Sequence, residues 1–354
     1  MRQRSPVFTV GLVVPLAGPE AMYGPSCILC ARLAAEELNA GSGILARAVR
    51  LRIVDGGRGP ERVACEVERL VDRGEIDAVV GWHLSAVRQR LTPRLRARVP
   101  YIYTALYEGG ETTPGVVAIG ETPEIQLHPG LRWMSEEIGV RDWFVVGNDY
   151  VWPRRSTEKV QALVDGERCG PSIGEADFVG LGTRDFAPVL DRIARSGADG
   201  VLMLLVGHDA VRFNRQFAAR GLEERCARFS PLMDESMLRD LGPGASNDIF
   251  TASGYFESLP TADSLGFGSR YVHRFGPGAP VLNAPGESCY EGVRLLAGLV
   301  DAVGSADADR VTTLARCSGY HGPRGHVRID GTATRQQIYM AAADGAEYEV
   351  LDSL

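Results

Sequence analysis

The chain has 354 residues, of which 45% are hydrophobic and 23% are charged, and its formal net charge is −7. A chain of this length favours two domains, and its core is large enough to need no disulfides. The negative net charge argues against a direct nucleic-acid partner, because phosphate backbones bind concentrated Lys and Arg. No stretch approaches the ~20 apolar residues of a membrane span, so we expect no membrane insertion.

The cysteines and the N-terminus bear on the compartment. The seven cysteines are irregularly spaced, which is not typical of a disulfide framework. They are Cys27, Cys30, Cys65, Cys169, Cys226, Cys289 and Cys317. Free thiols favour a reducing compartment, and the first apolar run is interpreted as a strand rather than a removable signal. We therefore expect a cytoplasmic protein that begins at a native Met1. The alternative is a periplasmic or extracellular protein whose export signal was removed.

Strands alternate with amphipathic helices through the first third of the chain. Apolar and β-branched runs predict strands at 7–16, 49–55, 77–81 and 100–104. Between them, apolar residues at helical spacing predict a helix at 26–39, a second from Pro60, and a third that ends near Arg98. This alternation predicts a mostly parallel, doubly wound sheet.

The same pattern restarts in the second part of the chain. Strands are predicted at 143–147, 176–179, 200–207, 227–233 and 249–256, with helices at 156–163, 186–196 and 210–220. A helix at 285–303 is expected to return to the first lobe, and 326–354 is interpreted as a strand followed by a hairpin. The sequence thus predicts an α/β fold of two doubly wound lobes. The first comprises residues 1–120 plus 250–325, and the second 121–249 plus 326–354.

Aromatic and hydroxyl side chains gather where the predicted strands end. In open parallel sheets, ligands bind beyond the carboxyl ends of the strands. His83 and Ser85 follow the strand at 77–81, and Tyr150 and Trp152 follow the strand at 143–147. Aromatic rings at such positions can enclose a small ligand, while hydroxyls and backbone amides orient it. Ser85 also has a structural interpretation, because it could cap the helix that it begins.

Motifs for catalysis, cofactors and metals are absent from the sequence. It contains no G-x-S-x-G elbow, no G-x-G-x-x-G after the first strand and no P-loop. The C-x-x-C of Cys27 and Cys30 falls inside a predicted helix, where core packing explains it. Cys317, His321 and His326 have no evident fourth partner for zinc. We expect no cofactor, no metal and no catalytic residue, and an enzyme on a doubly wound fold is the alternative from a different class.

Several segments resemble a known family when they are taken in their order along the chain. They are VGWHLSAVRQRLTP (80–93), YEGGE (107–111), GNDYVWPRRS (147–156), the stretch 178–207 and SGYFESLPT (253–261). Over about residues 7 to 350, the sequence resembles the type I periplasmic-binding-protein fold. Within the branched-chain amino acid binding family, the resemblance is to the branch of amide sensors (AmiC-like) and urea-binding proteins.

The resemblance implies two lobes joined by a three-segment hinge that closes on a small ligand. The ligand would be a short amide or urea, or a small amino acid. The protein would act without catalysis as a cytoplasmic ligand sensor that restrains an RNA-binding antiterminator. The alternative is the exported substrate-binding component of an ABC transporter, whose partner is a permease.

The resemblance and the strand-end rule together select the candidate ligand-binding residues. His83 stands where relatives usually have Tyr, and Ala105 and His208 also depart from the family pattern. Ser85 and Tyr150, one from each lobe, are expected to bind opposite ends of one ligand. The full set is Tyr23, His83, Ser85, Tyr103, Ala105, Tyr150, Trp152, Gly207, His208 and Asp234.

Overall fold

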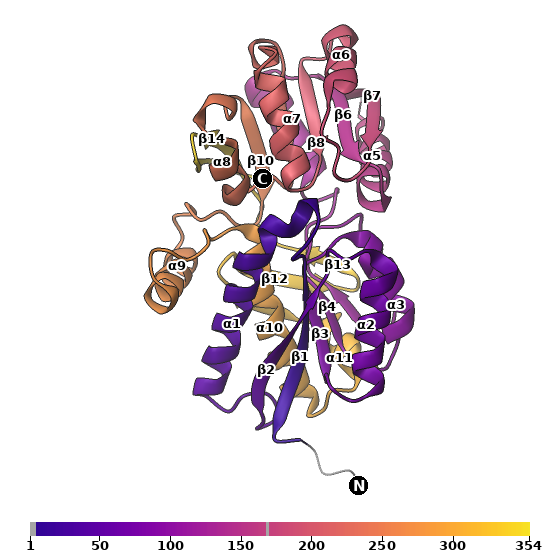
Figure 1. Cartoon of the computed structure of the whole chain (residues 1–354), viewed down its shortest axis with the longest axis vertical. Helices are drawn as coiled ribbons and strands as arrows, with labels where there is room; N and C mark the ends of the chain where they lie inside the picture. The colour runs from indigo at the N-terminus through magenta and orange to yellow at the C-terminus, as the bar shows by residue number, and fades with distance from the viewer. Residues whose placement is uncertain (1–4, 168–169) are drawn as a thin grey trace. The chain divides into compact units, whose positions relative to one another are not determined.

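The computed structural model describes residues 5–167 and 170–354, which fold into two compact units (Figure 1). Unit 1 is Met1–Gly120 with Thr261–Gln336, and unit 2 is Glu121–Pro260 with Gln337–Leu354. The chain passes between the units three times, as expected from the sequence. Met1 and Cys169, which entered the sequence-based prediction of the compartment, lie outside the described residues.

Unit 1 is built on a five-stranded parallel sheet. Its strands are β1 (Val7–Val14), β2 (Ala48–Asp55), β3 (Ala78–Gly81), β4 (Tyr101–Tyr103) and β5 (Val116–Ala118), in the order β2-β1-β3-β4-β5. β1 and β3 are buried along almost their whole length, which explains their continuous apolar sequence. The prediction of a doubly wound parallel sheet is confirmed for this unit.

Helices and a small second sheet complete unit 1. A 3₁₀ turn, η1 (Pro19–Tyr23), leads into α1, and α1 packs against α10 while α2 packs against α3. The helices are α1 (Gly24–Ala40), α2 (Pro60–Asp72), α3 (Ser85–Leu95), α9 (Ala262–Phe275), α10 (Ala284–Val303) and α11 (Ala308–Ala315). The second sheet is antiparallel and contains β11 (Gly319–Gly322), β12 (Gly325–Asp330) and β13 (Ala333–Arg335).

Unit 2 is built on a seven-stranded mixed sheet in the order β15-β14-β10-β9-β8-β6-β7. Five strands are parallel: β6 (Asp142–Asn148), β7 (Ser172–Val179), β8 (Gly200–Leu204), β9 (Ala227–Ser230) and β10 (Ile249–Ser253). The C-terminal hairpin of β14 (Tyr339–Asp344) and β15 (Glu347–Ser353) is antiparallel to them. The helices are α4 (Leu127–Trp133), α5 (Val151–Val164), α6 (Ala187–Ser196), α7 (His208–Ala218) and α8 (Glu235–Leu241).

Two predicted lobe boundaries differ from those of the structure. Residues 250–260 were assigned to the first lobe, but β10 pairs with β9 and β14 in the sheet of unit 2. Residues 326–336 were assigned to the second lobe, but β12 pairs with β11 and β13 in unit 1. In both cases, pairing with a strand distant in sequence decides the unit to which the segment belongs.

Within the described residues, no helix combines the length and the apolar character needed to cross a membrane. Cys27 and Cys30 are buried in α1, which agrees with their interpretation as core residues. His321 lies opposite His326 in the β11–β12 ladder, and its Nε2 is 2.8 Å from Asp263 Oδ2. Among the described residues, no group of His, Cys, Asp and Glu is arranged to hold a metal ion.

Candidate functional site

A buried polar network follows the carboxyl ends of β3 and β4 in unit 1. The Ser85 hydroxyl, at the first residue of α3, donates to Glu108 Oε2 at 2.7 Å. Arg88, three residues further along the same helix, donates to Glu108 Oε1 and to Glu111 Oε2. The structure therefore excludes the predicted capping role of Ser85, because Leu84 occupies the cap position and α3 has no side-chain cap.

Arg88 keeps its charge in this network although its side chain is only 4% exposed. Burial lowers the pKa of Arg88. The neighbouring Tyr103, Glu108 and Glu111 together raise this pKa by more than burial lowers it, so the net shift is upward. The guanidinium also lies over the rings of Tyr103 and Tyr107, at 5.3 and 4.9 Å from their centroids. Two carboxylates and one guanidinium give this group of residues a net negative charge.

His83 and Tyr103 have polar atoms that are already bonded within unit 1. The His83 ring donates from Nδ1 to the Leu84 carbonyl at 3.2 Å and accepts at Nε2 from the Tyr101 hydroxyl at 2.8 Å. Burial, followed by the nearby charge of Arg88, lowers the pKa of His83 to about 4, so the ring is neutral at pH 7. The Tyr103 hydroxyl donates to the His83 carbonyl at 2.8 Å. Both side chains thus bond to the segment that leads into α3.

Backbone N–H groups and aromatic rings adjoin this network. The Leu84 carbonyl accepts from the N–H groups of Val87 and Arg88, and the first N–H groups of a helix have no acceptor within the helix. They can donate to a ligand oxygen, which the helix dipole also favours. Tyr23, at the end of η1, packs its ring 4.5 Å from that of Trp82. Ala105, two residues after the end of β4, is buried.

In unit 2, a second buried network joins the carboxyl ends of β6 and β8. Asn148 accepts from the Val206 N–H at 2.9 Å and donates to Asp209 Oδ2 at 2.9 Å. Asp209 also accepts from the Gly182 N–H and from Arg212. Burial raises the pKa of Asp209, although these hydrogen bonds and Arg212 oppose the shift. The network fixes the segments that lead from β6 into α5 and from β8 into α7, next to Tyr150 and Gly207.

The predicted ligand residues of unit 2 lie at the starts of three helices. Tyr150 occupies the cap position of α5, and its ring centroid is 6.2 Å from that of the buried Trp152. Gly207 precedes α7 with a φ of 50°, a conformation that favours glycine. His208 is about half exposed, and its Nδ1 lies 3.7 Å from Asp240 Oδ2.

Asp234 has a clear structural role at the start of α8. Its Oδ1 accepts from the Met237 N–H at 2.9 Å, which caps the helix. The adjacent Glu235 is buried and accepts from the Glu257 N–H at 2.8 Å. Burial, together with the charge of Asp234, raises the pKa of Glu235 to about 8, so it is mostly protonated at pH 7.

The structure brings His83 into contact with Tyr103 and Tyr150 into contact with Trp152, and it adds residues that the sequence analysis missed. Arg88 and Glu108 are the main additions in unit 1, and Asn148 is the main addition in unit 2. Arg88 could have been found, because a spacing of three residues places it on the same helix face as Ser85. Nothing in the sequence pairs Ser85 with Glu108, which is 23 residues away.

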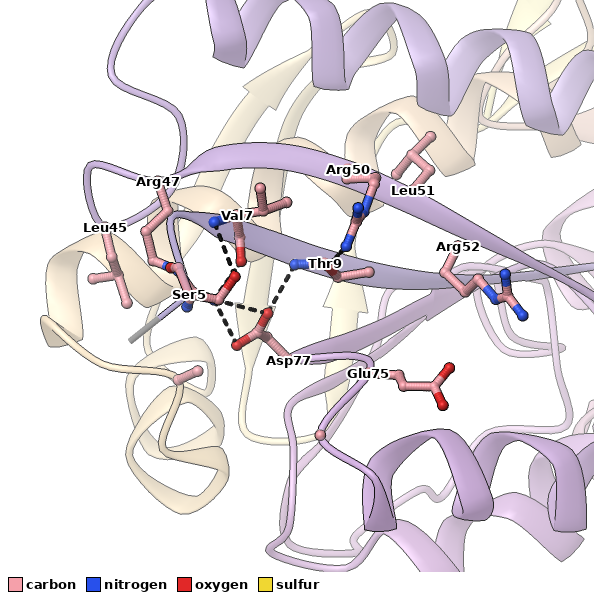
Figure 2. A pocket seen from close by; sticks show the side chains of 12 residues that line it. Ser5, Val7, Thr9, Leu45, Arg47, Arg50, Leu51, Arg52, Glu75 and Asp77 are labelled. Atoms are coloured by element: carbon pink, nitrogen blue, oxygen red, sulfur yellow. Dashed lines mark hydrogen bonds and ion pairs between the residues drawn. The ribbon is translucent and has the colours of Figure 1, made fainter. Parts of the chain in front are cut away.

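A hollow of about 670 Å³ lies at the other end of the unit 1 sheet, where β1 and β2 begin (Figure 2). Arg47 there donates to the Val7 carbonyl and to both oxygens of Asp77, and Asp77 accepts from the Thr9 N–H (Figure 2). These bonds hold the start of β1 against the segment before β3. Because the hollow lies at the amino ends of the strands, it is separate from the network of Ser85 and Glu108.

The fold and the comparisons define the class of the protein. Residues 7–347 match the family described as periplasmic binding protein, and the chain belongs to this family. It is a substrate-binding protein with the type I fold. Leu/Ile/Val-binding protein homolog 6 of Brucella melitensis is a relative with 26% identity over an alignment of 358 positions, and the match covers 97% of this chain and 90% of the relative.

Solved structures agree on the fold. The solute binding protein of an ABC transporter from Rhodopseudomonas palustris HaA2, in complex with p-hydroxybenzoic acid, matches with a TM-score of 0.87 and 19% identity, over 98% of this chain and 97% of that chain. The branched-chain amino acid transporter substrate binding protein LivJ from Streptococcus pneumoniae, in complex with isoleucine, matches with a TM-score of 0.82 and 19% identity, over 98% and 99% of the two chains.

Proposed function

We propose that this protein is the non-catalytic substrate-binding component of an ABC transporter and that its solute is a small amino acid. The observation that supports this most strongly is membership of the periplasmic binding protein family over residues 7–347. The names of the relatives also favour the transporter over the cytoplasmic amide sensor. The family is normally exported, so we propose an extracytoplasmic location and a permease as partner.

The chemistry of the strand ends supports a solute that carries both charges. Backbone N–H groups at the starts of α3, α5 and α7 are suited to a carboxylate. The acidic side chains Glu108 and Asp234 are suited to an ammonium group, and the rings of Tyr23, Tyr150 and Trp152 to an apolar side chain. A short amide or urea would use the same donors without needing the acidic groups.

We further propose that Ser85 and Tyr150 bind opposite ends of one solute. Each follows the carboxyl end of a parallel strand in its own unit, which is where ligands of open α/β sheets bind. The Ser85 hydroxyl donates to Glu108, so its oxygen can still accept from a ligand N–H. His83 and Tyr103 would act by holding the position of Ser85.

A thermal-shift screen followed by calorimetry tests the proposed solute class. A ligand that binds only the folded protein stabilises it by RT ln(1 + [L]/Kd). The panel contains branched-chain and small amino acids, hydroxybenzoates, short amides and urea. We expect at least one amino acid to raise the melting temperature and to bind with one-to-one stoichiometry. If only amides or urea bind, the interpretation as an amide sensor replaces the proposed transporter component. If only hydroxybenzoates bind, the proposal that the solute is an amino acid is wrong.

A further inference from the structure

A second cavity, of about 400 Å³, lies entirely within unit 1 and away from the carboxyl ends of β3 and β4. Its walls come from α9, α10, β11 and the turn after β11. The lining residues are Ala262, Asp263, Gly266, Arg270, Tyr290, Glu291, Arg294, Leu295, Gly298, Tyr320, His321, Gly322 and Pro323. A volume of this size is within the range of small-molecule sites.

Two glycines inside the helices create part of this space. Glycine weakens a helix interior and is usually explained by close packing. Gly292 of α10 has that explanation, because an added Cβ would lie 2.5 Å from Thr104 Cγ2. Gly298, six residues further along α10, has no atom within 4 Å of the same position, and the nearest atom to a Cβ at Gly266 of α9 is Nη1 of Arg270 at 3.6 Å. Both glycines line the cavity, so their missing side chains leave room for a ligand.

The charges that line the cavity are unequally satisfied. Glu291 accepts from the Tyr320 hydroxyl at 2.7 Å and from Arg324 Nε at 2.6 Å. Arg324 Nε also lies 3.3 Å from Glu287 Oε2, so two carboxylates share this guanidinium. Asp263 Oδ2 lies 2.8 Å from His321 Nε2. Arg294 is exposed and, within residues 5–167 and 170–354, makes no ion pair or hydrogen bond. Arg294 is therefore the one guanidinium of the lining without a partner among these residues, since Arg270 pairs with Glu37.

Arg270 adds a second guanidinium from the opposite wall. Its Nε donates to Glu37 at 2.9 Å and its Nη2 to the Tyr290 hydroxyl at 3.3 Å, which fixes the plane of the group. Its Nη1 remains beside the space over Gly266. Leu295 and Pro323 supply apolar surface between the charged groups. An oxyanion at Arg294, with an apolar body against these side chains, complements the lining.

We propose that this cavity is a second ligand site, specific for a small organic carboxylate with an apolar or aromatic body. The carboxylate binds the guanidinium of Arg294, assisted by Arg270, and the body lies beside Tyr290, Leu295 and Pro323. The proposal does not depend on the identity of the transported solute.

Amide resonances of the full chain, titrated with 4-fluorobenzoate, test this site. We expect saturable shifts in residues 262–270, 290–298 and 320–323. Arg294→Gln should weaken this binding at least tenfold, because a charge-assisted hydrogen bond is lost. Gly298→Leu should fill the cavity and abolish the shifts without lowering the melting temperature. Arg62→Gln, which removes an exposed charge of α2, is the matched control and should bind as the wild type does.

In the same titration, the resonances of residues 82–87 and 104–108 report on the strand-end site. Their response to 4-fluorobenzoate should be the same in Arg294→Gln as in the wild type. Inorganic phosphate should bind at the cavity more weakly than 4-fluorobenzoate, because it lacks an apolar body. Wild-type affinity in Arg294→Gln, persistent cavity shifts in Gly298→Leu, or equal affinity for phosphate would overturn the proposal. The absence of any saturable shift in the three segments would do the same.

Discussion

At His83, burial and hydrogen bonding fix both the charge and the tautomer of the ring. The Leu84 carbonyl can only accept, so Nδ1 carries the proton and Nε2 accepts from Tyr101. A protonated ring would have to reverse the Tyr101 bond, with Nε2 as the donor, and would be a buried cation close to Arg88. These costs explain why the pKa of His83 is lowered to about 4.

The lowered pKa predicts how the stability of the protein depends on pH. Between pH 6.5 and pH 4, the unfolded chain binds a proton that the folded ring resists, so acidification favours unfolding. From pH 7 to pH 5, this one group should reduce the free energy of unfolding by about 2 kcal/mol. Urea unfolding of His83→Gln at the two pH values should show a loss smaller by about that amount.

His273→Gln serves as the control, because His273 is exposed on α9. Its pH dependence should match that of the wild type. If His83→Gln loses as much stability on acidification as the wild type, the ring is not the buried neutral group described above.

At the scale of a helix, α10 offers a matched pair of glycines. Gly292→Ala would place a Cβ 2.5 Å from Thr104 Cγ2 and 2.9 Å from Val80 Cγ1, which pushes α10 away from the sheet. Overpacking of this kind costs ~1–3 kcal/mol and should outweigh the helix propensity gained. Gly298→Ala meets no atom within 4 Å and should stabilise the protein by ~0.5–1 kcal/mol.

Urea denaturation midpoints of the two alanine variants measure this difference directly. The prediction is a lower midpoint for Gly292→Ala and a higher one for Gly298→Ala. Shifts in the same direction would show that the packing of α10 against Val80 and Thr104 is not as close as the structure has it.

The elements that the sequence predicted well are those with a strong local pattern. The β1 and β8 runs are mostly apolar, and α10 has the length of a single long helix, so each was found with small errors at its ends. The helix α9 and the short strand β5 were not predicted. The segments 250–260 and 326–336 were placed in the wrong lobe, because only pairing with distant strands decides their unit.

The candidate site was predicted to a similar extent. The strand-end rule located Ser85 and Tyr150, but it could not show that the ring of His83 is fully bonded within its own unit. The partnership of Ser85 with Glu108 depends on the fold of the loop after β4, and no local pattern in the sequence encodes it.

For the whole molecule, the proposed function requires that residues of both units contribute to the binding of one solute. Removing the Ser85 hydroxyl or the Tyr150 hydroxyl should leave a polar atom of the bound solute unpaired, at a cost of ~1–3 kcal/mol. Since α3 has no side-chain cap, Ser85→Ala should not lose a helix cap. Ser318→Ala and Tyr339→Phe, which remove hydroxyls outside both networks, are the matched controls.

Calorimetry of the solute identified by the screen, with wild type, Ser85→Ala and Tyr150→Phe, is the most direct test. Each variant should bind roughly tenfold or more weakly, while the controls bind as the wild type does. Melting temperatures without solute should confirm that the two variants are folded. If Tyr150→Phe binds the solute as tightly as the wild type, Tyr150 does not bind the solute, and the proposal that both units hold it through these two hydroxyls is contradicted.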